Sequence, residues 1–210
     1  MYRTFVVTLL LLSFCAVGCS HRKPSTATSS VQSLAPETEA ADQSAVYSAA
    51  LTQLFQDEHP KLLVIRNRTL CYDNPDYLKT TTADQRVQEM KRDFPAVDES
   101  TLRDFDAKQL TPSEIIAGFT LPVKYVVMKD NYFVGTTDQN PERRFREFAR
   151  RFPDARGIVS LSRVGFNDTR DQALVRVEFA CPLCGFGDRV FLKKQSGKWV
   201  VVDTFVGWVS

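Results

Sequence analysis

Residues 173–180 alternate between apolar and polar side chains. Arg176 and Glu178 fall on one face of this segment, and the opposite face carries only apolar residues, namely Ala173, Val175, Val177 and Phe179. A period of two with one polar face predicts a half-buried antiparallel strand. Three more strands are predicted close by, at residues 158–164, 189–194 and 199–206. Because strands that are neighbours in sequence tend to pair, we expect a meander.

The connections between these strands carry residues that reverse a chain. The sequence CPLC at residues 181–184 predicts a turn between the second and third strands, and the glycines in residues 185–188 predict the reversal of direction after it. Residues 195–198 predict a second reversal, because Gly197 can adopt a positive φ angle there.

The last predicted strand, residues 199–206, is apolar on both faces apart from Asp203 and Thr204. A strand that is buried on both faces has a nearly continuous apolar sequence of this kind. We therefore expect other parts of the protein to cover both of its faces.

The N-terminal half predicts helices and two strands. Apolar residues from Tyr47 to Phe55 recur at helical spacing, which predicts an amphipathic helix over residues 43–58. The apolar runs at residues 62–65 and 121–128 predict strands, and residues 66–82 are polar and rich in turn formers. Later helices are predicted at residues 83–94, where Thr82 and Gln85 form a capping box, at residues 98–108, and from Asn140 onward, with Phe145, Phe148 and Phe152 on one face.

The composition fits one globular domain with appendages. The chain has 210 residues, of which 43% are apolar, enough for a hydrophobic core. Its formal net charge is only +2, so nothing favours nucleic acid as a partner. The sequence contains neither a glycine-rich phosphate loop nor a His-Glu-x-x-His helix motif, and we expect no cofactor, no metal ion and no catalytic residue.

The first 42 residues predict a leader and a tether. A short basic segment precedes an apolar run of roughly 13 residues, shorter than the roughly 20 of a membrane-spanning helix, so residues 1–18 predict a signal peptide. Residues 16–19, AVGC, resemble the bacterial lipobox, which implies lipidation of Cys19; ordinary signal cleavage nearby is the alternative. Ser20 follows the cysteine, and by resemblance to Gram-negative lipoproteins this implies the outer membrane, facing the periplasm. Residues 19–42 predict a flexible tether, which leaves 43–210 as the globular domain.

Cys181 and Cys184 carry the most distinctive chemistry of the predicted domain. A redox-active dithiol needs its first cysteine at a helix N-terminus, where backbone dipoles lower the thiol pKa, but strands are predicted on both sides here. A structural zinc site needs four ligands, and only Cys71 and His59 could join the pair. We therefore interpret the pair as a structural disulfide of an oxidising compartment. Thiol redox chemistry, metal binding and a bond from Cys71 to either cysteine remain alternatives.

The helix that begins near Asn140 is strongly basic. Arg143, Arg146 and Arg150 are candidate anion-binding residues on it, for example toward lipid headgroups. The alternative is a solvated face whose aliphatic stems cover neighbouring apolar surface.

Several motifs occur together in the C-terminal part of the chain. They are SRVGFN at residues 162–167, QALV at 172–175, CPLCG at 181–185 and GKW at 197–199. In these motifs the chain resembles a family of uncharacterised bacterial exported proteins, over residues 45–209. The resemblance implies a shared fold and implies no activity.

Together these patterns predict an α+β fold, with a C-terminal antiparallel sheet of about four strands packed against amphipathic helices. We expect a membrane-anchored lipoprotein of the cell envelope that acts as a binding or structural module for an unknown envelope protein or small ligand. The alternative function is thiol redox or metal binding by Cys181 and Cys184. A third possibility is a cone-shaped fold like nuclear transport factor 2, which an apolar cavity lined by Phe179 and Trp199 would favour.

Overall fold

The computed structural model describes residues 35–116, 118–129 and 141–210. The predicted signal peptide, the lipidation candidate Cys19 and the first part of the predicted tether lie outside these residues. The described residues belong to one unit, Leu34–Ser210. No helix within them has the length and apolar character needed to cross a membrane.

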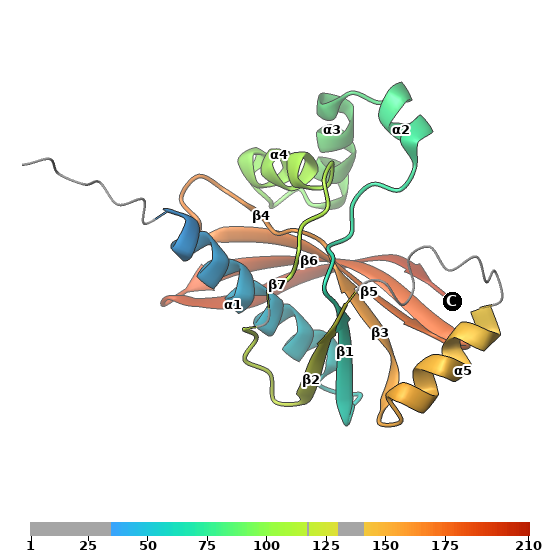
Figure 1. The fold of residues 1–210 in the computed structure, drawn as a ribbon. Helices are drawn as coiled ribbons and strands as arrows, with labels where there is room; N and C mark the ends of the chain where they lie inside the picture. The colour runs from blue at the N-terminus through green and yellow to red at the C-terminus, as the bar shows by residue number, and fades with distance from the viewer. Residues whose placement is uncertain (1–34, 117, 130–140) are drawn as a thin grey trace, which may run out of the picture. The chain divides into compact units, whose positions relative to one another are not determined.

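A mixed sheet forms the centre of the fold (Figure 1). Its strands run in the order β2-β1-β3-β5-β6-β7, and β4 pairs with β5 beside this path. The strands are β1 (Leu62–Arg66), β2 (Lys124–Met128), β3 (Ala155–Leu161), β4 (Gly165–Phe166), β5 (Gln172–Cys181), β6 (Cys184–Gln195) and β7 (Lys198–Val209). β1 is parallel to β2 and to β3, whereas the C-terminal strands pair antiparallel.

The α+β class agrees with the prediction, but the expected strand number was too low. The sheet has seven strands, because the two apolar runs of the N-terminal half join the C-terminal meander as its parallel part and the short strand β4 pairs with β5. The helices are α1 (Ala35–Phe55), α2 (Pro75–Thr80), α3 (Ala83–Asp93), α4 (Glu99–Lys108) and α5 (Pro141–Arg151).

Helix α1 covers one face of the sheet. It buries Tyr47, Leu51 and Phe55 in the largest hydrophobic cluster, together with Val175 and Val177 of β5. The helical spacing recognised in the sequence therefore does define the buried face of α1.

The start of α1 differs from the prediction, because residues 35–42 are helical rather than part of the tether. Glu39 forms ion pairs of 2.9 Å with both Lys108 and Arg170, and Asp42 forms one of 2.7 Å with Lys194. Hydrogen bonds, first from Lys108 and then from Arg170, hold the pKa of Glu39 below its ordinary value. These partners lie far away in sequence, so composition alone could not reveal them.

The opposite face of the sheet carries two separate groups of helices, α2–α4 and α5 (Figure 1). α3 and α4 enclose a second cluster that includes Leu174 of β5 and Phe191 of β6. α5 forms a third cluster, in which Phe148 packs with Val64 of β1 and Ile158 of β3. Between these two groups the sheet carries the partly exposed side chains of Arg176 and Glu178 on β5.

Two helix starts follow capping signals in the sequence. The Thr82 hydroxyl accepts a hydrogen bond of 3.2 Å from the Gln85 amide, and the Gln85 side chain accepts one of 2.8 Å from the Thr82 amide, as the capping box predicted. α2 was missed. Its cap is Asn74, whose side chain accepts from two backbone amides at 3.0 Å, with Pro75 as the first helical residue.

The turns of the C-terminal meander were predicted in part. The β6–β7 turn has Ser196 at φ 49° and Gly197 at φ 79°, as a two-residue hairpin turn requires. Residues 185–188 are not a reversal but belong to β6, because the chain already reverses between the paired residues Cys181 and Cys184.

Candidate functional site

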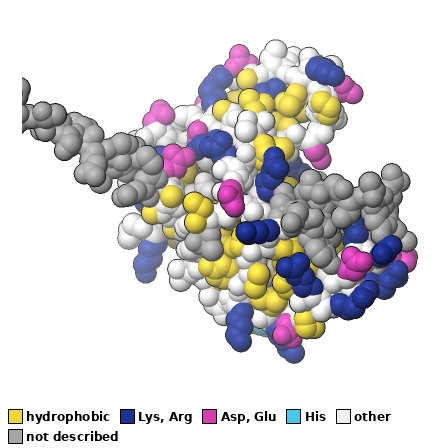
Figure 2. All heavy atoms as spheres, in the orientation of Figure 1, with side chains coloured by type: hydrophobic (Ala, Val, Ile, Leu, Met, Phe, Trp, Pro, Cys, Tyr) yellow, Lys and Arg dark blue, Asp and Glu magenta, His cyan; other side chains and the backbone are white. Residues whose placement is uncertain are grey.

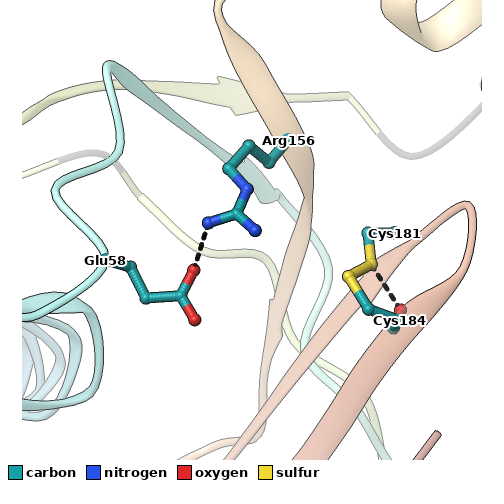
Figure 3. The surroundings of a disulfide bond; sticks show 4 residues. All are labelled: Glu58, Arg156, Cys181 and Cys184. Carbon is teal, nitrogen blue, oxygen red and sulfur yellow. Dashed lines mark hydrogen bonds and ion pairs between the residues drawn. A yellow bond between two sulfur atoms is a disulfide. The ribbon is translucent and has the colours of Figure 1, made fainter.

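Cys181 and Cys184 form a disulfide bond at the tip of the β5–β6 hairpin (Figure 3). Their Cα atoms are 5.1 Å apart, and the two residues are a directly opposed pair in the antiparallel register. The loop that the bond closes is very short, so we expect it to stabilise the fold by only about 2 kcal/mol. Its position is that of a brace on a hairpin.

The surroundings of this bond favour the structural interpretation. Strands flank both cysteines, so a helix N-terminus that would lower a thiol pKa is not beside them. Nearby, Arg156 of β3 points to Glu58, which follows α1, and their 2.6 Å ion pair is drawn in Figure 3. Cys71 is a half-buried free thiol, and no cluster of three potential metal ligands occurs within the described ranges.

The three arginines chosen from the sequence lie on the exposed side of α5. Figure 2 shows basic side chains gathered over this helix, with acidic ones among them. Arg143 pairs with Glu147 at 3.5 Å and Arg146 with Glu142 at 3.6 Å, and Arg150 is exposed. The two pairs are solvated i,i+4 contacts worth about 0.3–0.5 kcal/mol each. The three arginines therefore remain candidates only for anion binding at the protein surface.

Arg144, on the same helix, takes a different position. It lines a cavity of about 230 Å³ between α5 and the sheet, together with Phe145 of α5 and Arg66 of β1. Its Nε group is buried and has no hydrogen-bond partner among the residues that the structure describes. A buried donor without a partner costs about 1–3 kcal/mol, a penalty that an acceptor reaching this group would remove.

The topology brings these groups together. Arg66 is the last residue of β1, and Ser160 is close to the end of β3, which runs parallel to β1. α5 connects β2 to β3, and the cavity-lining residues of α5 belong to its first half. Crevices at the carboxyl ends of parallel strands are common ligand sites in open sheets.

The remaining walls of the cavity define what it can hold. Ile158 of β3, Ala180 of β5 and the Phe145 ring are apolar, whereas Ser160 offers a hydroxyl group and is only 8% exposed. The nearest acidic group in the sheet register is Glu178, opposite Ser160, and Arg176 already forms an ion pair with it. The cavity therefore combines guanidinium groups with an apolar wall.

A larger groove of about 1320 Å³ runs along α1, and the hydroxyl groups of two of its lining residues, Ser48 and Tyr47, are engaged within the protein. The Ser48 hydroxyl donates to the Ser44 carbonyl at 2.8 Å and accepts from the Thr120 amide at 2.9 Å. The hydroxyl group of Tyr47, another lining residue, donates to the Ser162 carbonyl at 2.8 Å. The smaller cavity is the better candidate because one of its lining residues, Arg144, has a buried Nε group without a partner among the described residues.

Neither of these two cavities is lined by both Phe179 and Trp199, the feature that would favour a cone-shaped fold. Trp199 borders the groove along α1. Phe179 instead packs against the Phe55 ring, 5.5 Å away between centroids, and against Phe186.

Asp188 is a buried acidic residue that does not line the candidate site. Asp188 of β6 is 8% exposed, its Oδ1 atom lacks a partner among the described residues, and burial raises its pKa. The pKa of Asp188 in the native state lies above its pKa in the unfolded chain. The free energy of unfolding is therefore highest at pH values below the unfolded-state pKa, and it falls as the pH rises through the native-state pKa. Asp188→Val should therefore raise the free energy of unfolding by about 1–3 kcal/mol at pH 7, and by less at pH 4. Urea unfolding at both pH values measures this; equal gains would contradict it.

The sequence contained a signal that could have identified Arg144. It lies four residues before Phe148, the most buried residue of α5, and residues four apart share a helix face. Arg146 and Arg150 are each two residues from Phe148 and must point away from the sheet. Arg66 and Ser160 carry no comparable signal, because their proximity depends on the parallel pairing of β1 with β3.

The chain was also compared with known proteins. No protein-family model matches it, and neither the curated proteins nor the solved structures contain a match. The candidate site therefore stands on its own geometry: Arg66, Arg144 and Ser160 around a small cavity with an apolar wall.

Proposed function

We propose that this protein is a membrane-anchored lipoprotein of the bacterial cell envelope and that it binds a small organic anion beneath α5. The lipobox-like residues 16–19 support the anchor, and the cavity supports the ligand. The protein acts as a binding module. The other kind of partner that we propose is an envelope protein. We propose no nucleic acid as a partner.

The buried Nε group of Arg144 is the single observation that carries the ligand assignment. Guanidinium groups match carboxylate and phosphate oxygens in geometry and charge. Arg66 and the Ser160 hydroxyl line the same cavity, so the anionic group of the ligand faces these three residues.

The size and lining of the cavity restrict the rest of the ligand. A water molecule occupies about 30 Å³ in the liquid, so 230 Å³ corresponds to about eight waters. Phe145, Ile158 and Ala180 suit a short apolar portion. The ligand class is therefore a carboxylate or phosphate group attached to a short hydrocarbon chain, with hexanoate as a suitable probe.

Thermal unfolding with hexanoate, and with hexanol as its neutral counterpart, tests this function. A hexanoate concentration about 100 times the dissociation constant should stabilise the protein by about 2.7 kcal/mol, a rise in Tm of about 5–10 °C. The rise should disappear in Arg144→Gln and persist in Arg143→Gln, whose side chain is exposed on the same helix. Equal effects of hexanoate and hexanol, or an undiminished rise in Arg144→Gln, would rule the assignment out.

The cellular location is a separate part of the proposal. A diacylated or triacylated Cys19 anchors the domain stably, because several acyl chains exceed the weak binding of one. Ser20 supports the outer membrane, with the domain facing the periplasm, and the resemblance to bacterial exported proteins supports export. Incorporation of a labelled fatty acid, lost in Cys19→Ser, is the expected result. Labelling that survives this substitution would contradict the anchor.

A further inference from the structure

β7 is an edge strand with an unusually apolar surface. β6 is the one described strand that pairs with it. The prediction that both faces of this strand are covered was wrong, since its exposed large apolar residues are Val200, Val202, Phe205, Val206, Trp208 and Val209. A long apolar edge with free backbone amides and carbonyls is a template for pairing with another strand.

Two bulges interrupt the pairing of β7 with β6. The register skips Val202 between the pairs Leu192–Val201 and Phe191–Asp203. It skips Gly207 in the same way, on the other side of Thr204. Bulges at an edge often protect it from pairing, so their arrangement decides whether a second strand could fit.

One bulge lies on each side of Thr204, with Val202 two residues before it and Gly207 three residues after it. An antiparallel pairing of β7 with a second β7, centred on Thr204, places Val202 opposite Val206 and Val201 opposite the bulge residue Gly207. Residues of the two copies that pair with β6 and would lie opposite each other also share the same face of the sheet. Val200 and Trp208 lie on the face of α3, as do Asp203 and Phe205, whereas Trp199 and Val209 lie on the face of α1.

We infer that β7 is the contact between two copies of this chain, which pair antiparallel across a two-fold axis at Thr204. A two-fold contact uses the same surface on both subunits and needs a surface that is complementary to itself. This register fulfils that condition where both opposed residues pair with β6, namely residue 199 with 209, 200 with 208 and 203 with 205. It also places each Asp203 opposite a phenylalanine, whereas a pairing centred on Asp203 would oppose two carboxylates.

The pairing joins the two sheets into one continuous sheet. Each subunit then covers apolar side chains that are exposed on one copy alone, among them Val202 and Val206. This inference is independent of the anion site, which lies near β1 and β3 at the other end of the strand order.

Cysteine cross-linking of the full chain tests the register. Directly opposed residues of antiparallel strands have Cα atoms about 4.5–5.5 Å apart, within reach of a disulfide. Thr204→Cys should therefore form a disulfide-linked dimer under mild oxidation. Val200→Cys is the matched control, because the two copies of residue 200 would be at least about 20 Å apart along the paired strands. It should remain uncross-linked, although it retains the same native cysteines.

Sedimentation velocity tests the association itself. The full chain, in detergent, should sediment with the protein mass of two copies, and Val202→Lys should reduce it to one copy while its Tm shows that it remains folded. A monomeric wild-type chain, or cross-linking of Val200→Cys as efficient as that of Thr204→Cys, would overturn the inference. If Val202→Lys does not fold, the cross-linking pair still decides the register.

Discussion

Asp106→Ala should lower the free energy of unfolding by about 3–5 kcal/mol. Asp106 of α4 and Arg86 of α3 form a bidentate pair with distances of 2.7 and 2.8 Å, and their side chains are only 3% and 6% exposed. The Tyr72 hydroxyl donates to the same carboxylate at 2.6 Å. Removing the carboxylate leaves the guanidinium group buried without its counter-ion, which is the costly way to break such a pair. Urea unfolding at pH 7 measures the loss.

Asp84→Ala provides the matched control for this prediction. Asp84 pairs with Arg103 at 2.7 Å between the same two helices, but both side chains are largely exposed. Its loss should therefore be at most about 1 kcal/mol. Equal losses for the two variants would show that burial does not set the strength of the Arg86–Asp106 contact.

Phe148→Ala should lower the free energy of unfolding by about 3–5 kcal/mol as well. Phe148 is 2% exposed and packs with Val64, Ile158 and Met128, so its removal leaves a cavity between α5 and the sheet. The same change should abolish stabilisation by hexanoate, because α5 supplies Arg144 and Phe145 to the ligand cavity. Thermal unfolding with and without hexanoate measures both effects.

Phe152→Ala separates this role from a general need for aromatic residues in α5. Phe152 follows the helix and is only partly buried at the edge of the same cluster, so its truncation should destabilise clearly less. If both variants lost the same stability, Phe148 would not be the residue that holds α5 on the sheet.

Local patterns predicted much of the fold because their causes are local. The alternation over residues 173–180 follows from the two faces of β5, of which one packs under α1. The capping box at Thr82 satisfies backbone groups within one turn of α3. The reversal at Gly197 depends on the φ angles of two residues.

The failures concern elements whose environment is set by distant residues. The parallel pairing of β1 with β2 and β3 joins segments separated by long stretches of chain, which periodicity does not report. The first turns of α1 depend on ion pairs of Glu39 and Asp42 with α4, β6 and the loop before β5. β7 has the sequence of a covered strand, yet it lies at the edge. Pairing with a second copy would give its apolar side chains cross-strand neighbours.

For the candidate site, the sequence identified the helix but not the residues. The basic character of residues 143–151 drew attention to Arg143, Arg146 and Arg150, which are the exposed ones. Burial and an unsatisfied donor, rather than the number of charges, distinguish Arg144 from them. These are properties of the packed structure, and only the four-residue spacing to Phe148 anticipates them.

The most direct test of the anion-binding account observes the Arg144 Nε–H group itself. Its signal in a proton–nitrogen NMR correlation spectrum can be assigned by its absence in Arg144→Gln. Titration with hexanoate should move this signal downfield as the buried donor gains an acceptor, whereas hexanol should leave it in place. A signal that stays unchanged under saturating hexanoate, while those of surface arginines such as Arg143 move, would contradict the account.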